Sequence, residues 1–503
     1  MGLKKDTFAL ICSIVLSAAL AALPAPAAGS KADEQPAARP DVPPALGLID
    51  LRSNFSDGAY DVETLVRMAK ERGFSVVVIN DHDRMALEYG LPPLRNLLKK
   101  REERGSINRW GASSWLHAIR EAEKKYPDMI ILPGTETAPF YHWTGNPVTG
   151  DLTAWNHERR ILTVGLDTPE DYETLPVLHN GFSTRWMNLA LPGILALLAA
   201  LAVGALLIRW KGPCRVAGIA VAVLSLVFLA NSDPFRSSPF DPYSGDPGIA
   251  PWQLLIDDVR AKGGLTFWNH VETRSGVREM GPVKVHTAPH PEVLDESRGY
   301  TGFAVLYGDT VTVTEPGGLW DRLLADYCRG YREHPAWGIA TAHYHRENEA
   351  GEQLGNFQTG FFVEKLTRKD VLEALRTGRT YAYRGTYPKF ARLDEFSVSS
   401  ADGGERALSG EQIALKGNAV IRIRISGDPE SRAAVRVRLI RSGELVKVFE
   451  GPLPLAVRYE DEYFRPGERA FYRIDMQEHG TLVSNPIFVD YRMDLDVKQA
   501  TGG

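Results

Sequence analysis

The sequence predicts an α/β protein that is interrupted by a helical membrane hairpin and followed by an all-β part. In the first part, short apolar runs that end in polar residues alternate with helical patterns, as in parallel α/β folds. Two long uncharged apolar runs lie near the middle of the chain, between residues 189 and 230. From Phe396 onward, apolar and polar residues alternate with a period of two, which is typical of strands buried on one face.

Length and composition limit the possible functions. The chain has 503 residues, of which 44% are hydrophobic and 24% are charged, with a net charge of −5. This length allows more than one domain. The negative charge and the lack of a basic stripe with interleaved aromatic residues argue against nucleic-acid binding. The three cysteines imply no disulfide framework.

The N-terminus predicts export. In residues 1–28, Lys4 and Lys5 precede an apolar run, and small residues follow it. This pattern predicts a signal peptide or an uncleaved N-terminal anchor, and either one would carry the following chain out of the cytoplasm. Residues 29–46 are rich in Ala and Pro without periodicity, which predicts a flexible linker.

Three early strands are each followed by polar residues. The first, near residues 48–51, precedes a polar cluster that ends at Gly58, and a helix is expected over 61–72. The second covers 76–79 and leads into Asn80, Asp81 and His82, and the third covers 129–132 and leads to Glu136. A helical region is predicted between them, over 92–126. Sites in parallel α/β folds are built at the carboxyl ends of strands.

Two further strands carry histidines. A helix over 249–262 precedes a strand that ends at His270, and a strand beginning at Trp337 leads to His343 and His345. In an extended segment His343 and His345 lie on the same side. His142, His157, His179, His286 and His290 are interpreted as ordinary polar loop residues, and a place in the wall of the pocket is the alternative for His142.

The two apolar runs predict a membrane hairpin. The first, residues 189–208, is long enough to span about 30 Å of hydrocarbon. The second covers 216–230, and a short basic turn joins the two. A pair of buried core helices is the alternative. The basic turn is expected in the cytoplasm, which places the other parts on the periplasmic or extracellular side of the cytoplasmic membrane.

The motifs resemble those of the PHP (polymerase and histidinol phosphatase) superfamily. Members begin with Asp-Leu-His-x-His, continue to Ser-Asp-Gly and later contain Thr-Asp-His; here Asp57 and the Asp81-His82 pair match. The first metal motif is degenerate, because Arg52 and Asn54 stand where two metal-binding histidines are usual. A helix that ends in Gly-Arg-x-Tyr and a final Ser-Asn-Pro-Ile resemble the carbaryl-hydrolase-like branch.

The resemblance implies a distorted, TIM-like (β/α) barrel with an inserted transmembrane hairpin and a C-terminal β-sandwich. The expected division of the chain is a signal or anchor at 1–28, a linker at 29–46, barrel parts at 47–187 and 232–385, a hairpin at 188–231, a sandwich at 386–491 and a tail at 492–503. Because the barrel pattern resumes after the hairpin, the hairpin is an insertion within one domain.

The resemblance also implies a metal site. The expected metal-site residues are Asp57, Asp81, His82, Glu136, His270, His343 and His345, with Asp81 orienting a neighbouring ligand. Carboxylates and imidazoles suit divalent Zn, Mn or Fe. Arg52 has no acceptor atom and cannot ligate a metal, so fewer ions than the family's usual number are expected.

Arg52 and Asn54 are assigned to substrate or anion binding. The Arg52 guanidinium supplies positive charge and can hold an anionic group through two hydrogen bonds. The alternative for Arg52 is a structural salt bridge to Asp50 or Asp57. No residue is assigned a catalytic role.

Two functions are compatible with these residues. The first is an exported, membrane-attached, PHP-type metal-dependent hydrolase, a phosphoesterase or a related ester or amide hydrolase, acting on an anionic small-molecule or envelope substrate. The second is a catalytically degenerate module that binds an anionic ligand or an envelope partner. The degenerate first motif favours the second function, and the retained ligands at the other strand ends favour the first.

Overall fold

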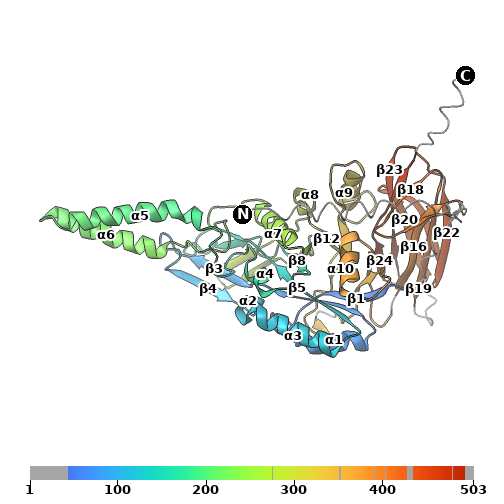
Figure 1. Ribbon diagram of the computed structural model, residues 1–503, viewed down its shortest axis with the longest axis horizontal. Helices are drawn as coiled ribbons and strands as arrows, with labels where there is room; N and C mark the ends of the chain where they lie inside the picture. The colour runs from blue at the N-terminus through green and yellow to red at the C-terminus, as the bar shows by residue number, and fades with distance from the viewer. Residues whose placement is uncertain are drawn as a thin grey trace, which may run out of the picture. The chain divides into compact units, whose positions relative to one another are not determined.

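A computed structural model describes residues 43–492, apart from 275, 282, 350–352, 390, 403, 428–433 and 479. These residues form a mixed α/β fold (Figure 1). The predicted signal or anchor at 1–28, most of the linker and nearly all of the tail lie outside the described residues. The predicted domain boundaries remain predictions.

One large sheet carries the first part of the chain. Its strands lie in the order β13 (Trp337–Ala340), β12 (Gly302–Leu306), β9 (Leu265–Trp268), β8 (Ile161–Val164), β5 (Ile130–Thr137), β2 (Val76–His82), β1 (Ala45–Leu51) and β14 (Phe357–Phe361). Strands β1, β2 and β5 are parallel, whereas β8 is antiparallel to both β5 and β9. The start of β8 therefore lies beside the ends of β5 and β9.

Helices cover this sheet because its strands are apolar on both faces. All seven residues of β2 are buried, as expected for a sheet covered on both sides. Helix α1 (Val62–Glu71) confirms the predicted helix; it begins after Asp61, whose side chain accepts a hydrogen bond from the Thr64 amide at 2.7 Å. Apart from the two long apolar helices described below, the other described helices are α2 (Ile107–Trp110), α3 (Ala112–Lys125), α4 (Pro169–Glu173), α7 (Ala250–Ala261), α8 (Val293–Glu296), α9 (Leu319–Cys328) and α10 (Arg368–Thr377).

The described strands do not form a closed barrel, so the predicted TIM-like barrel is not confirmed. A single bridge does join the segment after β13 to the end of β1, between Tyr344 and Leu51. The Tyr344 amide donates to the Asp50 carbonyl at 3.1 Å, and the Arg52 amide donates to the Tyr344 carbonyl at 2.9 Å. These contacts bring the histidines that follow β13 to the end of β1.

The predicted helical region over 92–126 is wrong in its first third. That part contains β4 (Lys99–Glu103), which pairs antiparallel with β3 (Ala86–Gly90); helices α2 and α3 come only afterwards. Glu88 on β3 lies 3.1 Å from Lys99 Nζ and 3.8 Å from Arg101 Nη1 on β4. Cross-strand charge pairs of this kind stabilise a strand. They allow a polar segment to form a strand although its apolar residues do not alternate.

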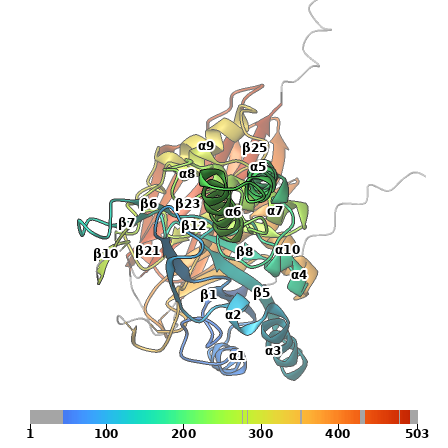
Figure 2. The same ribbon diagram turned by 90° about the vertical axis from the view of Figure 1, so that its left-hand side faces the viewer.

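The two apolar runs form helices α5 (Met187–Leu207) and α6 (Pro213–Asn231), which lie side by side (Figures 1 and 2). Their backbones approach closely at Gly204, where an added Cβ would lie 2.9 Å from the Ala222 nitrogen. Each helix is long and apolar enough to cross a membrane. Only 6% of the most apolar 18-residue stretch of α5 and 11% of that of α6 are buried. Neither is therefore a buried core helix.

The last part of the chain contains two sheets that share one core. The large sheet continues through β15 (Thr380–Arg384), β24 (Thr481–Ser484), β23 (Arg469–Gln477), β20 (Ala434–Arg441) and β21 (Glu444–Pro452). Strand β25 (Ile487–Tyr491) pairs with β23, and β18 (Gln412–Leu415) pairs with β25. The second sheet contains β17 (Arg406–Leu408), β16 (Ala391–Ser400), β19 (Ala419–Gly427) and β22 (Leu455–Asp461). Alternate residues of β19, such as Ile421 and Ile423, join β20 and β23 residues in one apolar cluster. Because β15 belongs to the same sheet as β14, the structure does not separate a β-sandwich domain.

A small sheet completes the fold near the strand ends of the large one. It contains β10 (Val277–Met280), β11 (Val283–His286), β7 (Thr153–Trp155) and β6 (His142–Thr144).

A buried ion pair connects α9 to β23, and its loss should destabilise the fold. Arg473 Nε lies 2.6 Å from Asp321 Oδ1, and both side chains are at most 2% exposed. We expect Asp321→Ala to lower the free energy of unfolding by about 3–5 kcal/mol, because it removes the carboxylate that this buried guanidinium contacts. Glu450→Ala, which breaks an exposed pair with Arg436, should cost less than about 1 kcal/mol. Denaturant unfolding of both variants would measure this, and equal losses would contradict it.

Candidate metal and anion site

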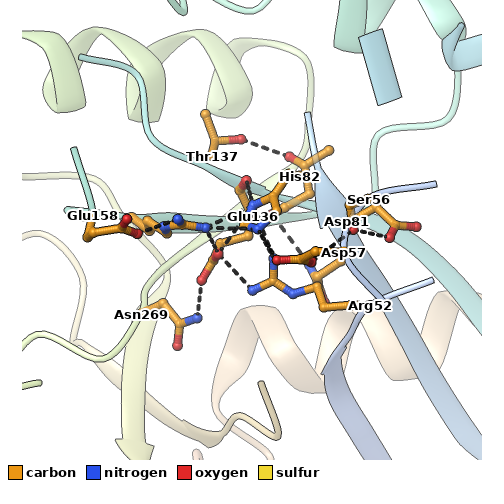
Figure 3. Close-up of polar contacts among 12 residues, drawn as sticks. Arg52, Ser56, Asp57, Asp81, His82, Glu136, Thr137, Glu158 and Asn269 are labelled. Carbon is orange, nitrogen blue, oxygen red and sulfur yellow. Dashed lines mark hydrogen bonds and ion pairs between the residues drawn. The ribbon is translucent and has the colours of Figure 1, made fainter. Parts of the chain in front are cut away.

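The polar residues predicted at the strand ends meet at one edge of the sheet. Arg52 directly follows β1, while His82 ends β2 and Glu136 lies near the end of β5. Figure 3 shows these three side chains pointing toward one another. His270 follows β9 and reaches the same place, since its Nε2 lies 3.0 Å from Glu136 Oε1. The sheet therefore brings together residues from four strand ends.

The Glu136 carboxylate is the centre of the cluster. Its Oε2 lies 2.7 Å from Arg52 Nη2 and 2.5 Å from Arg160 Nη1. Its Oε1 accepts a hydrogen bond from Asn269 Nδ2 at 2.8 Å and also contacts His270. Glu136 is only 1% exposed. Both carboxylate oxygens are thus occupied by protein donors.

The electrostatics favour charged groups at this position. Burial would raise the pKa of Glu136, but the charges of Arg52 and Arg160 hold it well below its usual range. Burial would also lower the pKa of Arg52, but Asp50 and Glu136 raise it above its usual value. Burial raises the pKa of Asp50, and the charge of Arg52 opposes that rise. The buried carboxylates are therefore compensated by guanidinium groups.

Arg52 makes the structural salt bridge that was the alternative to anion binding. Its Nη2 lies 3.0 Å from Asp50 Oδ1, and its side chain has no exposed surface. The second predicted anion-binding residue, Asn54, is exposed and does not line the cleft beside the cluster. Neither residue is thus placed to contact a ligand in the cleft.

Sequence analysis missed Arg160 and Asn269. Arg160 precedes β8, and because β8 is antiparallel to β5, the residue before it lies beside the end of β5. Asn269 also donates to Asp50 Oδ2 at 2.9 Å. The position of Asn269 next to His270 at a strand end could have identified it from the sequence. Arg160 could not be identified in this way, because its place depends on the direction of β8.

A second set of contacts surrounds Asp57. Its Oδ2 lies 3.2 Å from His82 Nε2 and 3.4 Å from His345 Nε2. Burial would raise the pKa of Asp57, but hydrogen bonds with His345 and His82 lower it below its usual range. His82 also faces Arg52 and Arg160, at 3.1 and 2.9 Å. Its Nδ1 also lies 3.5 Å from Glu136 Oε2, so the imidazole lies among two carboxylates and two cations.

Asp81 has a positioning role in the loop. It accepts hydrogen bonds from the Ser53 amide at 2.7 Å, the Ser56 hydroxyl at 2.5 Å and Trp115 Nε1 at 2.9 Å. These contacts fix the loop that carries Asp57 (Figure 3). Asp81 thus orients a neighbouring residue.

Glu136, His270 and His343 fit one metal ion. One potential ligand atom from each lies within 4.8 Å of the others, which suits nitrogen and oxygen ligands at about 2.0–2.2 Å from a shared metal. The buried His270 Nδ1 has no hydrogen-bond partner among the described residues. A second ion bridged by Glu136 does not fit, because two guanidinium groups contact the oxygen that it would need.

The backbone is strained at the same place. Asp50, His270 and His343 have φ angles of 72°, 32° and 46°. Left-handed conformations are uncommon for residues other than glycine and cluster at functional sites. The strain marks three strand ends that converge on the cluster.

A cleft of about 500 Å³ opens beside the cluster. The predicted residues Asp57, His82, His270, His343 and His345 line it. Its cationic lining consists of Arg104, Arg160, Arg278 and Arg346. The carboxylates of Asp57, Glu158, Asp309 and Glu349 line the cleft as well, and Arg160, Arg278 and Arg346 pair with two of them. Arginines bind phosphates and carboxylates through paired hydrogen bonds, so Arg104, which pairs with no described carboxylate, is the group that most favours an anionic ligand.

Comparisons with known proteins give only distant likenesses. No family model matches the chain, and no curated protein matches it. A Bacteroides vulgatus two-domain protein containing a predicted PHP-like metal-dependent phosphoesterase is 11% identical with a TM-score of 0.35, over 86% of this chain and 90% of that one. A presumed metal-dependent phosphoesterase from Bifidobacterium adolescentis is 18% identical with a TM-score of 0.29, over 62% and 93%. Likenesses at this level establish no family.

The environment of His82 predicts a loss of stability in acid. Burial, followed by the charges of Arg160 and Arg52, lowers the pKa of His82 to about 4, whereas an unfolded histidine titrates near 6.5. Between these values the unfolded chain binds more protons than the folded one. The free energy of unfolding should therefore fall by up to about 3 kcal/mol as the pH drops from 6.5 to 4.

Urea unfolding in the presence of a chelator, at several pH values between 7 and 4, would measure this loss. The variant His82→Gln cannot titrate and should show a smaller loss of stability with acid. Identical pH dependences for the two proteins would contradict the prediction.

Proposed function

We propose that the protein is an exported, membrane-attached, PHP-type hydrolase of phosphoesters that uses a single divalent metal, Zn, Mn or Fe. The observation that carries this proposal is the convergence of Glu136, His270 and His343 beside a cleft lined by arginines. The motif residues Asp57 and His82, which carry the resemblance to PHP proteins, line the same cleft. Related ester or amide substrates suit the same chemistry.

The residues around the cleft have distinct roles in this proposal. A bound metal supplies polarisation of the phosphoryl group and a water of lowered pKa. Arg160 is 5% exposed and contacts both Glu136 and the cleft, so it orients a phosphate relative to the ligand cluster. Arg278 lines the outer part of the cleft and pairs with Glu158. Asp57 holds His82 and His345 in place through its Oδ2 atom.

Membrane attachment is supported by the two exposed apolar helices. The turn between them contains Arg209 and Lys211, and Arg215 follows in the first turn of α6, which favours a cytoplasmic position for the turn. Both ends of the hairpin then lie on the outer side of the membrane. The N-terminal pattern in residues 1–28 favours the same side.

The contact between Arg52 and Glu136 favours a second candidate, a non-catalytic module that binds an anionic ligand or an envelope partner. A guanidinium supplies a permanent positive charge at the centre of the cluster without a metal. Such a site would retain the anion-binding cleft and lack the Lewis acid needed for hydrolysis.

Metal content tests the first candidate. We expect about one equivalent of transition metal in the purified full chain, bound by His270 and His343. The variant His343→Ala should weaken metal affinity by more than about 100-fold, since even the loss of an outer-sphere partner costs 10–100-fold. His334→Ala, which removes an exposed histidine that precedes β13 and does not line the cleft, is the matched control.

Elemental analysis and competition with a chelating dye would measure both quantities. Hydrolysis of a phosphomonoester that depends on the added metal would support the enzyme. A protein that stays free of metal after reconstitution would exclude the hydrolase and leave the anion-binding module.

Arg278 should contribute to anion binding under either candidate. Its side chain is about half exposed, so Arg278→Ala should fold normally. We expect the variant to bind inorganic phosphate about tenfold more weakly, because a hydrogen bond to a charged group contributes about 1.5–3 kcal/mol. Calorimetric titration would measure this, with Arg436→Ala on β20 as an equally exposed control. Unchanged affinity in Arg278→Ala would contradict the assignment of the phosphate position.

A further inference from the structure

A second, apolar cavity lies next to the polar cleft. It has a volume of about 930 Å³, and its walls include Leu87, Leu91, Leu98, Trp143 and Val283. We call it the apolar groove. Leu91 and Leu98 are 48% and 53% exposed, so both present apolar surface that no described part of the protein covers. An apolar cavity of this size suits a hydrocarbon ligand.

The groove and the cleft are continuous at one end. Met85, Arg104 and Arg278 line both of them. Arg104 is exposed and makes no ion pair or side-chain hydrogen bond with any residue that the structure describes. An unpaired cation thus stands where the apolar walls meet the polar ones, which suits a ligand whose charge and hydrocarbon chain are covalently joined.

The other end of the groove lies beside the helical hairpin. Leu91 and Leu98 flank a short loop, and Asn96 in that loop contacts Asn231, the last residue of α6. The Asn96 amide donates to Asn231 Oδ1 at 2.9 Å, and Asn96 Nδ2 donates to the Asn231 carbonyl at 2.7 Å. The groove therefore begins where the apolar helices end.

We propose that the apolar groove holds the hydrocarbon chain of an amphiphilic phosphate that enters from the bilayer, with its anionic head in the polar cleft. The inference rests on the proposed function and adds the substrate class to it. The occupant follows from the continuity with the cleft, from the cations at the junction and from the position beside the hairpin. A short hydrophilic phosphate would leave the groove unfilled, whereas a chain of methylene groups would gain from each group that is buried there.

The experiment compares two phosphates that differ only in chain length. The full chain in phosphatidylcholine nanodiscs is titrated with methyl phosphate and with decyl phosphate, and the uptake of each ligand by empty nanodiscs is subtracted. The variants are Leu91→Glu and Leu98→Glu, which place a charge in the groove at exposed positions. The control is Leu445→Glu on β21, which is also about half exposed.

We expect the unmodified chain and Leu445→Glu to bind decyl phosphate at least tenfold more tightly than methyl phosphate. Leu91→Glu and Leu98→Glu should lose this preference and retain their affinity for methyl phosphate within about twofold. Decanol should bind much more weakly than decyl phosphate. Decyl phosphate should bind more weakly to Arg104→Ala than to the unmodified chain.

Three results would overturn the inference, and they have two different meanings. Equal affinity of the unmodified chain for both phosphates, or a chain-length preference that survives in Leu98→Glu, would exclude the groove and leave the proposed function intact. Failure of the unmodified chain to bind either phosphate would exclude the anion site itself, and the inference with it.

Discussion

The arrangement of the whole site depends on the pairing of the Glu136 carboxylate with two guanidinium groups. A buried carboxylate is costly unless a cation compensates it. In a metal cluster the ions supply that compensation. Here Arg52 and Arg160 supply it through contacts of 2.7 and 2.5 Å to one oxygen. These contacts explain how the cluster holds a carboxylate that is only 1% exposed.

Two features of the sheet make this pairing possible. Strand β8 is antiparallel to β5, so its first residues, and Arg160 just before them, lie at the edge where β5 ends. The segment after β13 bridges to β1 at Tyr344, so His343 and His345 reach the same edge without a strand ladder. A sheet with only parallel strands would have placed the residue before β8 at the opposite edge.

Much of the site could be predicted because strand ends are visible in the sequence. Glu136, His82 and His270 each follow a short apolar run, and the structure brings all three together. Arg160 could not be predicted, because its place depends on the direction of β8, which apolar periodicity does not specify. The strand β4 was missed because its residues are all polar or charged, and its partner β3, through Glu88, stabilises it by charge.

The two arginines differ in what they can do for a ligand. Arg52 is fully enclosed and contacts only the protein, so its charge acts on the cluster and does not bind a ligand directly. Arg160 contacts Glu136 with Nη1 and Glu158 with Nη2 while its side chain reaches the cleft. Because both groups keep their charge at any physiological pH, the Glu136 carboxylate stays compensated whether or not a metal is bound. Metal occupancy at Glu136, His270 and His343 would then decide between hydrolysis and binding alone. The arginines that line the cleft and the apolar groove would select the ligand in both cases.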